Sequence, residues 1–485
     1  MAFNSSLFLL YFLPVFLAVY FLLPGKSKNW FLLIVSVLFY SWGAPMFLPV
    51  LVLSVFVDYF LIRRMQQREG NTRSFLYGLS VILNLGVLLY FRYLIPEFAK
   101  ASGDGGWLGI HTATWLKIAL PIGLSFITFQ KLAYTFDVHK KHFPGFDSFW
   151  DYALFIFMFP QLLSGPICRP GQIAGQLSDR RATSNIDHKL NGLYRFMIGL
   201  AKKVLIADFL RITVNAIFLL DPSQLSTGIA WIGAITYSFQ IYFDFSGYSD
   251  MAIGIALILG FKLPENFNSP YLSQSITEFW RRWHITLSFW FRDYIFLPLA
   301  YSFSRKLPKE KYAGLRADKV IYLFSVIVTF LLCGYWHGAE HKYIAWGLYM
   351  GLFLAADRLF LLRYLKKAGK IPAIGITFLF LTIGWVLFRA ENLHVARIYL
   401  SKMFSFSEGI NDIWLSSKYW TVLIIAVIFS FWSGIKKIEQ WGGQIYHSPS
   451  NSILVIMTLF SILLLIICEA NINAAGFSPF IYFRF

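Results

Sequence analysis

Long apolar runs separated by short polar turns recur along the whole chain. Many are long enough to cross about 30 Å of hydrocarbon as a helix. We predict helices in or across a membrane over residues 7–23, 30–42, 46–62, 76–93, 118–136, 150–164, 191–219, 229–247, 251–261, 319–335, 343–360, 371–388, 420–435 and 452–468. Three of them, 118–136, 150–164 and 251–261, are interpreted as bent, buried or re-entrant, which is tolerated where protein surrounds the backbone. The pattern predicts an all-α polytopic membrane protein, and residues 1–485 are interpreted as one membrane-embedded domain.

Residues 275–300 depart from this pattern. Aromatic side chains lie all round the segment, and Arg281, Arg292 and Asp293 interrupt it. Such a sequence suits a helix near the membrane interface or packed inside the protein better than a helix that faces lipid. We place it on the inner side of the membrane, because a basic loop at 301–319 follows it directly.

Composition agrees with a membrane protein. Only 14% of the residues are charged, against roughly 25% in an average soluble domain. The formal net charge is nevertheless +18. Lys and Arg cluster in short turns, where they set orientation and meet anionic lipid headgroups. No basic stripe lies outside such turns, so we expect the lipid bilayer and no nucleic acid as a partner. A second use of this charge is to attract a phosphate-bearing cytosolic cofactor.

The basic turns also predict an orientation. The turns that carry Lys26 and Arg63 belong on the cytoplasmic side, as does the loop at 301–319. Segment 319–335 then runs outward, and His337 just after it lies toward the outer face. The N-terminus and the C-terminal tail are both expected outside.

Cysteine and histidine spacing argues against a metal site. Cys168, Cys333 and Cys468 form no CxxC pair, and we interpret them as small apolar packing residues. His337 and His341 have the i, i+4 spacing of a metal pair, but the order of an HEXXH motif is absent. We therefore predict no bound metal.

Two polar islands carry the candidate chemistry, because ionisable groups in a membrane usually mark a functional site. His337 lies in GYWHGAE, where Gly334 and Gly338 permit close backbone approach. A neutral imidazole there can take a proton from an attacking hydroxyl. The alternative is a packed histidine with a satisfied hydrogen bond. His284 lies in RRWHITLS and either orients a substrate, donates to a carbonyl or acts as a second base, or else is structural. Cys333 shares a helical face with His337, which permits a thiol relay, although simple packing is favoured.

Three arginines of the first island are candidates for gripping cofactor phosphates: Arg281, Arg282 and Arg292. Guanidinium groups pair with phosphate in a bidentate way. The alternative is that they reach toward lipid headgroups or pair with Glu278 and Asp293.

Four polar residues share one apolar run: Asp244, Ser246, Tyr248 and Asp250. They either line a tunnel or form a hydrogen-bond network between helices. Asn266 and Asn268 in PENFNSP either bind a carbonyl or sugar hydroxyl or serve as turn-capping amides.

Taken together, these motifs resemble one family. They are LPIGLSFITFQKLAYTFDVHK at 120–140, FPQLLSGPICRP at 159–170, the long segment from DFSGYSD to FLPL at 244–299, GYWHGAEHKYIAWGLYMG at 334–351 and FIYFRF at 480–485. The chain resembles a membrane-bound O-acyltransferase of the bacterial alginate O-acetyltransferase subgroup. The likeness covers nearly the whole chain, and the combination of motifs is more specific than any one of them.

The resemblance implies a ring of about 11 transmembrane helices, with re-entrant or interfacial helices, around a central tunnel that Trp336 helps to line. It implies that His337 is the catalytic histidine and His284 the second, inner-side histidine. Acetyl-CoA would be the cytosolic donor, with no cofactor bound permanently. The expected function is O-acetylation of an extracytoplasmic polysaccharide such as alginate, peptidoglycan or cellulose, through a periplasmic SGNH-type acetyltransferase. The expected location is the bacterial inner membrane, with both termini periplasmic.

Other functions stay open at this point. A transporter or exporter of an acyl group or polysaccharide precursor makes no bond and would not consume acetyl-CoA. A structural scaffold explains neither histidine. An acyltransferase of the teichoic-acid D-alanylation type takes its acyl group from a carrier protein.

Overall fold

The computed structural model describes residues 1–95, 123–162, 165–180, 185–307, 309–312, 314–406, 408–411, 413, 415–435, 451–476 and 479–480. Contacts within the chain group it into two compact units, Met1–Phe196 with Ser249–Pro264, and Met197–Tyr248 with Glu265–Phe485. The single membrane-embedded domain over 1–485 stays a prediction. The start of segment 118–136, the Leu163–Ser164 turn and most of the FIYFRF tail lie outside the described residues.

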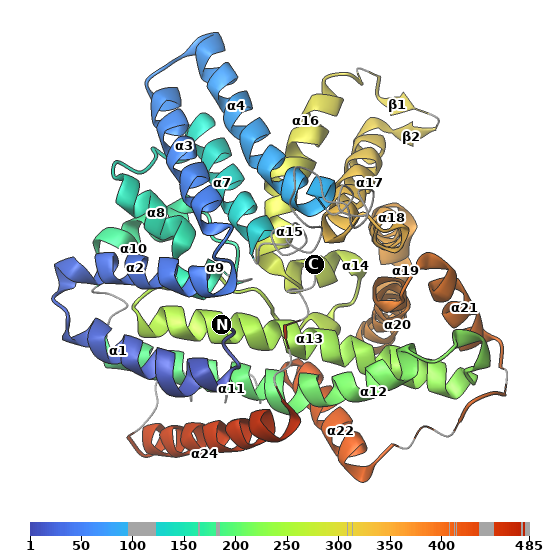
Figure 1. Ribbon diagram of the computed structural model, residues 1–485. Coiled ribbons are helices and arrows are strands. Elements are labelled where there is room, and N and C mark those ends of the chain that lie inside the picture. Colours follow the sequence, from blue (N-terminus) through green and yellow to red (C-terminus); the bar gives the residue numbers. More distant parts are fainter. Residues whose placement is uncertain are drawn as a thin grey trace, which may run out of the picture. The chain divides into compact units, whose positions relative to one another are not determined.

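The first unit is built from short and medium helices. They are η1 (Leu7–Phe12), α1 (Leu13–Leu22), α2 (Gly25–Gly43), α3 (Leu48–Gln66), α4 (Gly70–Leu89), η2 (Tyr90–Leu94), α7 (Leu124–His139), α8 (Phe149–Phe157), α9 (Phe159–Leu162) and α10 (Pro170–Ser178), together with most of α11 (Ile186–Ala201). Helices α3, α4 and α7 pack against one another, and α2 packs on α8 (Figure 1).

A buried carboxylate ties the first unit together. Asp58 of α3 accepts hydrogen bonds from the Ser80 hydroxyl at 2.6 Å, the Asn84 amide at 2.9 Å and the Tyr152 hydroxyl at 2.7 Å. These donors come from α4 and α8. Because a buried charge is costly unless it is hydrogen-bonded, the network fixes how the three helices pack.

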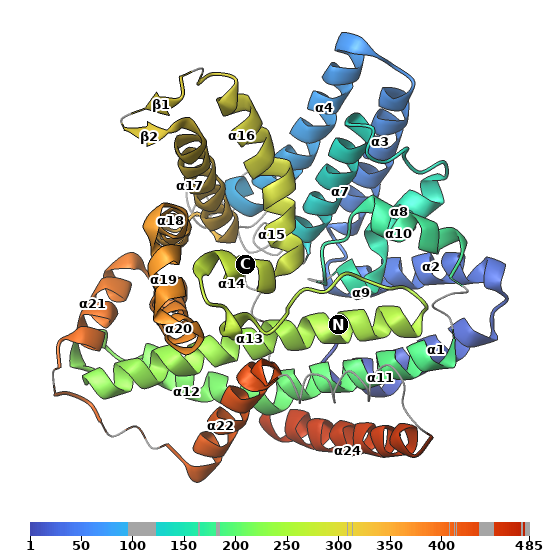
Figure 2. The same cartoon turned by 180° about the vertical axis from the view of Figure 1, so that it is seen from behind.

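The second unit begins with η6 (Lys202–Ala207), α12 (Asp208–Phe218) and the 3₁₀ turn η7 (Pro222–Gln224). The helices that follow are α13 (Thr227–Ile258, which continues into the first unit), η8 (Pro270–Leu272), α14 (Ile276–Arg282), α15 (Ile285–Phe291), η9 (Arg292–Phe296), α16 (Leu297–Ser304), α17 (Ala317–His337), α18 (His341–Ala356), η10 (Asp357–Leu361), α19 (Leu362–Ala368), α20 (Lys370–Arg389), α21 (Leu393–Phe404), α22 (Ser417–Phe431), η11 (Trp432–Gly434) and α24 (Asn451–Ala475). A small antiparallel hairpin, β1 (Lys311–Tyr312) and β2 (Leu315–Arg316), precedes α17, with Lys311 opposite Arg316. Helix α18 packs against both α17 and α20 (Figure 2).

An apolar cluster anchors α20 in the second unit. Ile217 of α12, Ile229 of α13, Val386 of α20 and Tyr399 of α21 are all buried together. The Tyr399 hydroxyl also donates to the carbonyl of Ala230 at 2.8 Å. Helix packing of this kind in a membrane protein is stabilised by van der Waals contact and by hydrogen bonds between helices. The cluster therefore holds the helix that carries two aromatic residues of the site described below.

Two expectations about helix boundaries are wrong. Segments 229–247 and 251–261 are one continuous helix, α13. The polar residues where the two segments meet lie on this helix, and Asp250 there pairs with Arg195 of α11. Segment 275–300 is not one helix, because the chain breaks at Trp283 and His284 between α14 and α15. By contrast, the bend expected within 150–164 is present at Met158, between α8 and α9.

The all-α membrane architecture is confirmed. Within the described part of the chain, six helices are long and apolar enough to cross a membrane: Gly70–Leu94, Ala317–His337, His341–Ala368, Lys370–Arg389, Ser417–Gly434 and Ser452–Ala474. The count of about 11 spans, the ring and the tunnel stay predictions.

Candidate active site

His337 is the last residue of α17 and is buried, with 4% of its surface exposed. Its ring is enclosed by aromatic side chains. The ring centroid lies 4.6 Å from that of Trp336, 5.1 Å from Trp346 and 5.0 Å from Phe388, all with edge-to-face geometry. Tyr343 lies farther away, at 6.4 Å. The enclosure lowers the local dielectric, so a proton transfer at this imidazole takes place away from bulk water.

Glycines bring the His337 end of α17 against α18. A Cβ atom at Gly334 would overlap the carbonyl oxygen of Tyr343, and one at Gly347 would overlap the carbonyl oxygen of Phe330. At Gly338, a Cβ would lie 2.7 Å from the Tyr343 ring. The close backbone approach predicted for Gly334 is therefore confirmed, whereas the space at Gly338 is taken by the Tyr343 side chain and not by backbone. Both contacts set the position of the histidine.

A cavity of about 470 Å³ lies one helical turn from His337. Its walls include Cys333 of α17, Trp280 and Arg281 of α14, and Arg292 of η9. Because Cys333 and His337 are four residues apart on one helix, they share a face. The cavity thus combines an apolar wall with two guanidinium groups, and its volume is within the range typical of small-molecule sites, about 300–1,000 Å³.

His284 occupies the break between α14 and α15 in a left-handed conformation, with φ 40° and ψ 54°. Its Nδ1 lies 3.0 Å from the side-chain oxygen of Asn266, which also accepts from the Thr286 hydroxyl at 2.9 Å. The Ile285 amide donates to the backbone carbonyl of Asn266 at 2.9 Å. The edge of Phe245 covers the ring at 4.6 Å. Asn266 therefore fixes both the backbone turn and the imidazole.

This environment sets the chemistry of His284. Burial lowers its pKa to about 3, so the ring is neutral at physiological pH. Because the Asn266 oxygen only accepts hydrogen bonds, Nδ1 carries the hydrogen and Nε2 the lone pair. A ring in this tautomer accepts a hydrogen bond or a proton at Nε2. It suits orientation of a hydroxyl better than donation to an oxyanion.

Aromatic rings connect the two histidines. Trp283, next to His284, lies 5.0 Å from Trp385, which stacks on Trp346 at 6.1 Å. Trp346 in turn packs edge-on against His337 at 5.1 Å. The series of ring contacts joins the break between α14 and α15 to α20, α18 and α17, so the spacing between the two histidines depends on packing of large rigid side chains.

The three candidate arginines have different surroundings. Arg281 and Arg292 line the cavity, whereas Arg282 is not among its lining residues. Arg282 pairs with Glu278 at 2.8 Å and donates to the carbonyl of Asn268 at 3.2 Å. The structural alternative thus describes Arg282 and Asn268, and Asn268 itself is exposed. It also applies in part to Arg292, which lines the cavity but pairs with Asp293 at 2.6 Å.

The polar residues of α13 are held mainly by ion pairs between helices. Lys203 Nζ lies 2.5 Å from Asp244 and 2.8 Å from Asp208 in the second unit. Asp250 pairs with Arg195 at 3.0 Å in the first unit. Both aspartates thus belong to polar networks between helices, which was one of the two alternatives considered for them. Their burial does not require that they line a tunnel.

The other two polar residues of α13 are also buried. Tyr248 stacks on Phe480 of the C-terminal tail at 4.4 Å, and Phe480 also contacts Phe245 at 5.5 Å. Phe480 thus packs behind the ring that covers His284. The Ser246 hydroxyl is buried and has no hydrogen-bond partner in the described part of the chain.

Sequence reasoning did not single out Trp346 and Phe388, which contact the His337 ring, or Trp280 and Trp385, which pack against Trp346. In a chain that is 19% aromatic, an aromatic residue carries little information about its position. Lys203 could have been found, because a lysine inside the predicted apolar segment 191–219 needs a partner. No cluster of three or more metal-ligating side chains occurs among the described residues.

Comparison with known proteins identifies the class. The family model of MBOAT, the membrane-bound O-acyltransferase family, matches residues 131–393, more than half of the chain. The chain belongs to this family and is a membrane-bound O-acyltransferase.

Its relatives act on different acceptors. A probable alginate O-acetylase, AlgI, of Azotobacter vinelandii is 36% identical, and the alignment covers 100% of both chains. A peptidoglycan O-acetyltransferase of Helicobacter pylori is 35% identical over 100% of this chain and 97% of the relative. A teichoic acid D-alanyltransferase of Bacillus subtilis is 29% identical over 56% of this chain and 69% of the relative.

Proposed function

We propose that the protein transfers an acetyl group from cytosolic acetyl-CoA, across a bacterial inner membrane, for O-acetylation of an extracytoplasmic polysaccharide. Two relatives that align over the whole chain are named for O-acetylation of alginate and of peptidoglycan. The D-alanyltransferase relative aligns with little more than half of it. Full-length similarity therefore favours the acetyl branch.

The proposed mechanism rests on the position of His337 beside a cavity. His337 is buried at the end of α17, one turn beyond Cys333 in the wall of a cavity that also holds Arg281 and Arg292. In the proposed step His337 takes the proton of the acceptor hydroxyl while that oxygen bonds to the acetyl carbonyl carbon. The carbon–sulfur bond then breaks, and the proton returns to the leaving thiolate. His284, neutral and fixed by Asn266, is separated from His337 by the rings of Trp283, Trp385 and Trp346, so it is proposed to accept a hydrogen bond from the substrate away from the reacting hydroxyl.

Acetyl-CoA is a substrate in this proposal and not a resident cofactor. The cavity is proposed to take the donor end of this molecule, with Arg281 and Arg292 contacting its phosphates. The acetyl thioester would enter past Cys333 toward His337. The apolar and aromatic walls would keep water from hydrolysing the thioester.

Delivery outside the membrane is proposed to involve a periplasmic SGNH-type acetyltransferase, with both termini of this chain on the same periplasmic side. This part rests on the basic turns of the sequence and on the family resemblance.

The test is thiol release from acetyl-CoA by the purified chain in nanodiscs, with the periplasmic partner and candidate glycans added in turn. His337→Ala should lower the rate by a factor of about 10²–10⁴, as expected for loss of a general base. The matched control is His394→Ala, since His394 is an exposed histidine of α21. Full activity of a folded His337→Ala protein would overturn the assignment.

A second series distinguishes the donors. Acetyl-CoA and an acyl-loaded carrier protein would be offered separately to the same preparation. Turnover with the carrier protein alone would refute the coenzyme donor and support chemistry of the D-alanylation type.

A further inference from the structure

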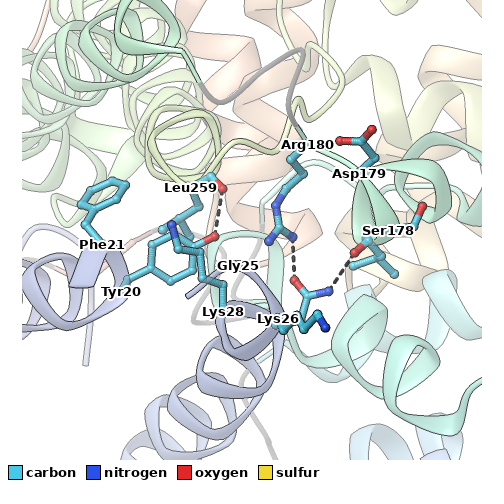
Figure 3. Close-up of a pocket in the computed structure, with 11 residues that line it drawn as sticks. Tyr20, Phe21, Gly25, Lys26, Lys28, Ser178, Asp179, Arg180 and Leu259 are labelled. Atoms are coloured by element: carbon cyan, nitrogen blue, oxygen red, sulfur yellow. Dashed lines mark hydrogen bonds between the residues drawn. The ribbon is translucent and has the colours of Figure 1, made fainter. Parts of the chain in front are cut away.

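A second cavity, of about 770 Å³, lies in the first unit and has a cationic rim (Figure 3). Lys26 and Lys28 reach it from the first turn of α2, and Arg180 from the segment just after α10. Asp179 is the one carboxylate among its lining residues. Three cationic groups against one carboxylate leave a formal balance of +2 in a confined space, which favours an anionic ligand.

The position of the arginine is built into the fold. Arg180 Nη1 donates to the side-chain oxygen of Asn29 at 2.7 Å, and the Asn29 amide donates to the carbonyl of Leu177 at 2.8 Å (Figure 3). This pair of bonds ties the end of α10 to α2. The arginine side chain is therefore held at the cavity before any ligand arrives, which reduces the entropy lost on binding.

The remaining wall is apolar and continues onto an exposed helix face. Tyr20 and Leu259 are buried, and the Tyr20 hydroxyl donates to the Leu259 carbonyl at 3.0 Å. Phe21, also in the wall, is 40% exposed. Along the same helix, Val15 and Val19 are also exposed. A cationic rim thus adjoins an open apolar surface.

The cations repel one another. Burial lowers the pKa of Lys28, and the nearby charges of Lys189 and Arg180 lower it further. Lys189 Nζ lies 4.8 Å from the centre of the Phe21 ring, so it stands at the same rim. Among the described residues, no carboxylate lies within ion-pair distance of Lys26, Lys28 or Lys189. A bound anion would relieve this repulsion.

We propose that this cavity binds the phosphate of an anionic membrane phospholipid, whose acyl chains lie along the exposed face of α1. Phosphate chemistry explains the lysines and the fixed arginine. The adjoining apolar face favours a lipid over a free phosphate compound, because basic pockets beside membrane helices are typical sites for lipid headgroups. The site is independent of the proposed acetyl transfer.

The experiment measures lipid binding to the full chain in detergent by native mass spectrometry, with phosphatidylglycerol titrated against phosphatidylcholine. We expect preferential binding of phosphatidylglycerol. The double variant Lys28→Gln/Arg180→Gln should weaken it about tenfold or more, because two charge-assisted hydrogen bonds are lost. The matched control is Lys366→Gln/Lys367→Gln, which removes the same charge from exposed positions of α19 and should bind normally.

Other results would overturn the proposal. Equal binding by the Lys28/Arg180 double variant and the wild-type chain would exclude this site. Glycerol phosphate or inorganic phosphate that binds as tightly as the lipid, with the same dependence on the variants, would show a free-phosphate site. If the double variant does not fold, Lys28→Gln alone and the charge-keeping Lys28→Arg serve instead. The first should weaken phosphatidylglycerol binding and the second should retain it.

Discussion

The ion pairs of Lys203 permit a sharp test of what the polar residues of α13 do. The side chain of Lys203 is 1% exposed, and its Nζ contacts Asp244 at 2.5 Å and Asp208 at 2.8 Å. It also lies 3.4 Å from the carbonyl of Pro479. Because a buried ammonium is costly unless it is paired and hydrogen-bonded, these contacts are what permit its burial. Lys203 therefore serves as the counter-ion of both aspartates.

Lys203→Met removes the cation and leaves two carboxylates facing each other, one of them buried. Breaking a buried ion pair in this way costs about 3–5 kcal/mol. Lys203→Met/Asp244→Leu removes the unpaired buried charge and should recover part of that loss. A double-mutant cycle then measures the coupling.

The assay is thermal and denaturant unfolding in detergent, alongside acetyl transfer. The matched control is Lys367→Met, an exposed lysine of α19 that should leave stability unchanged. Asp244→Asn should lose stability and activity together. If Lys203→Met unfolds like the wild-type chain, or Asp244→Asn loses transfer with unchanged stability, the structural role is refuted and a tunnel role for Asp244 gains support.

Three further predictions concern the site and its supports. His284 is neutral in the fold, with a pKa of about 3 against an ordinary value of 6.5. The contribution of this residue to the free energy of unfolding should therefore be complete above pH 6.5 and fall toward pH 3 by up to about 1.4 kcal/mol per pH unit. The variant His284→Asn, which tolerates the left-handed backbone, should flatten this pH profile of stability, and an unchanged profile would contradict the prediction. Cys333→Ala should keep most of the acetyl transfer, since we interpret this thiol as a packing residue. Two results together would instead show a covalent relay: a folded but inactive Cys333→Ala protein, and an acylated Cys333 thiol in the wild-type protein, detected by mass spectrometry. Gly347→Ala should lower the melting temperature, because its Cβ would overlap the Phe330 carbonyl, whereas Gly375→Ala, with open space around it in α20, should be neutral or slightly stabilising.

The sequence predicted the structure well where a local pattern fits only one kind of structure. Long apolar runs predicted the helical membrane fold, and the helix α17 was placed within two residues at each end. The glycines around His337 predicted close packing, since a glycine lets another backbone approach where any side chain would obstruct it.

The sequence did not decide the structure where a local pattern fits two different structures. The polar residues of α13 suited either a tunnel lining or a network between helices, and the choice depended on Lys203 and Arg195 on other helices, a pairing that lies beyond any local window. His284 gave no sign of its left-handed backbone, because the break there is fixed by Asn266, 18 residues away. Contacts over such distances decide the site and are not encoded in periodicity.

The length of α13 has a consequence for how the chain is made. At about 1.5 Å per residue, its 32 residues span about 48 Å, well beyond the roughly 30 Å of a hydrocarbon layer. It is not among the six helices whose composition suits a lipid-facing span. Its two paired aspartates need protein partners, and both partners, Arg195 and Lys203, lie earlier in the sequence. During synthesis each basic partner therefore leaves the ribosome before the acid it neutralises, so neither aspartate has to wait for its counter-ion to be made.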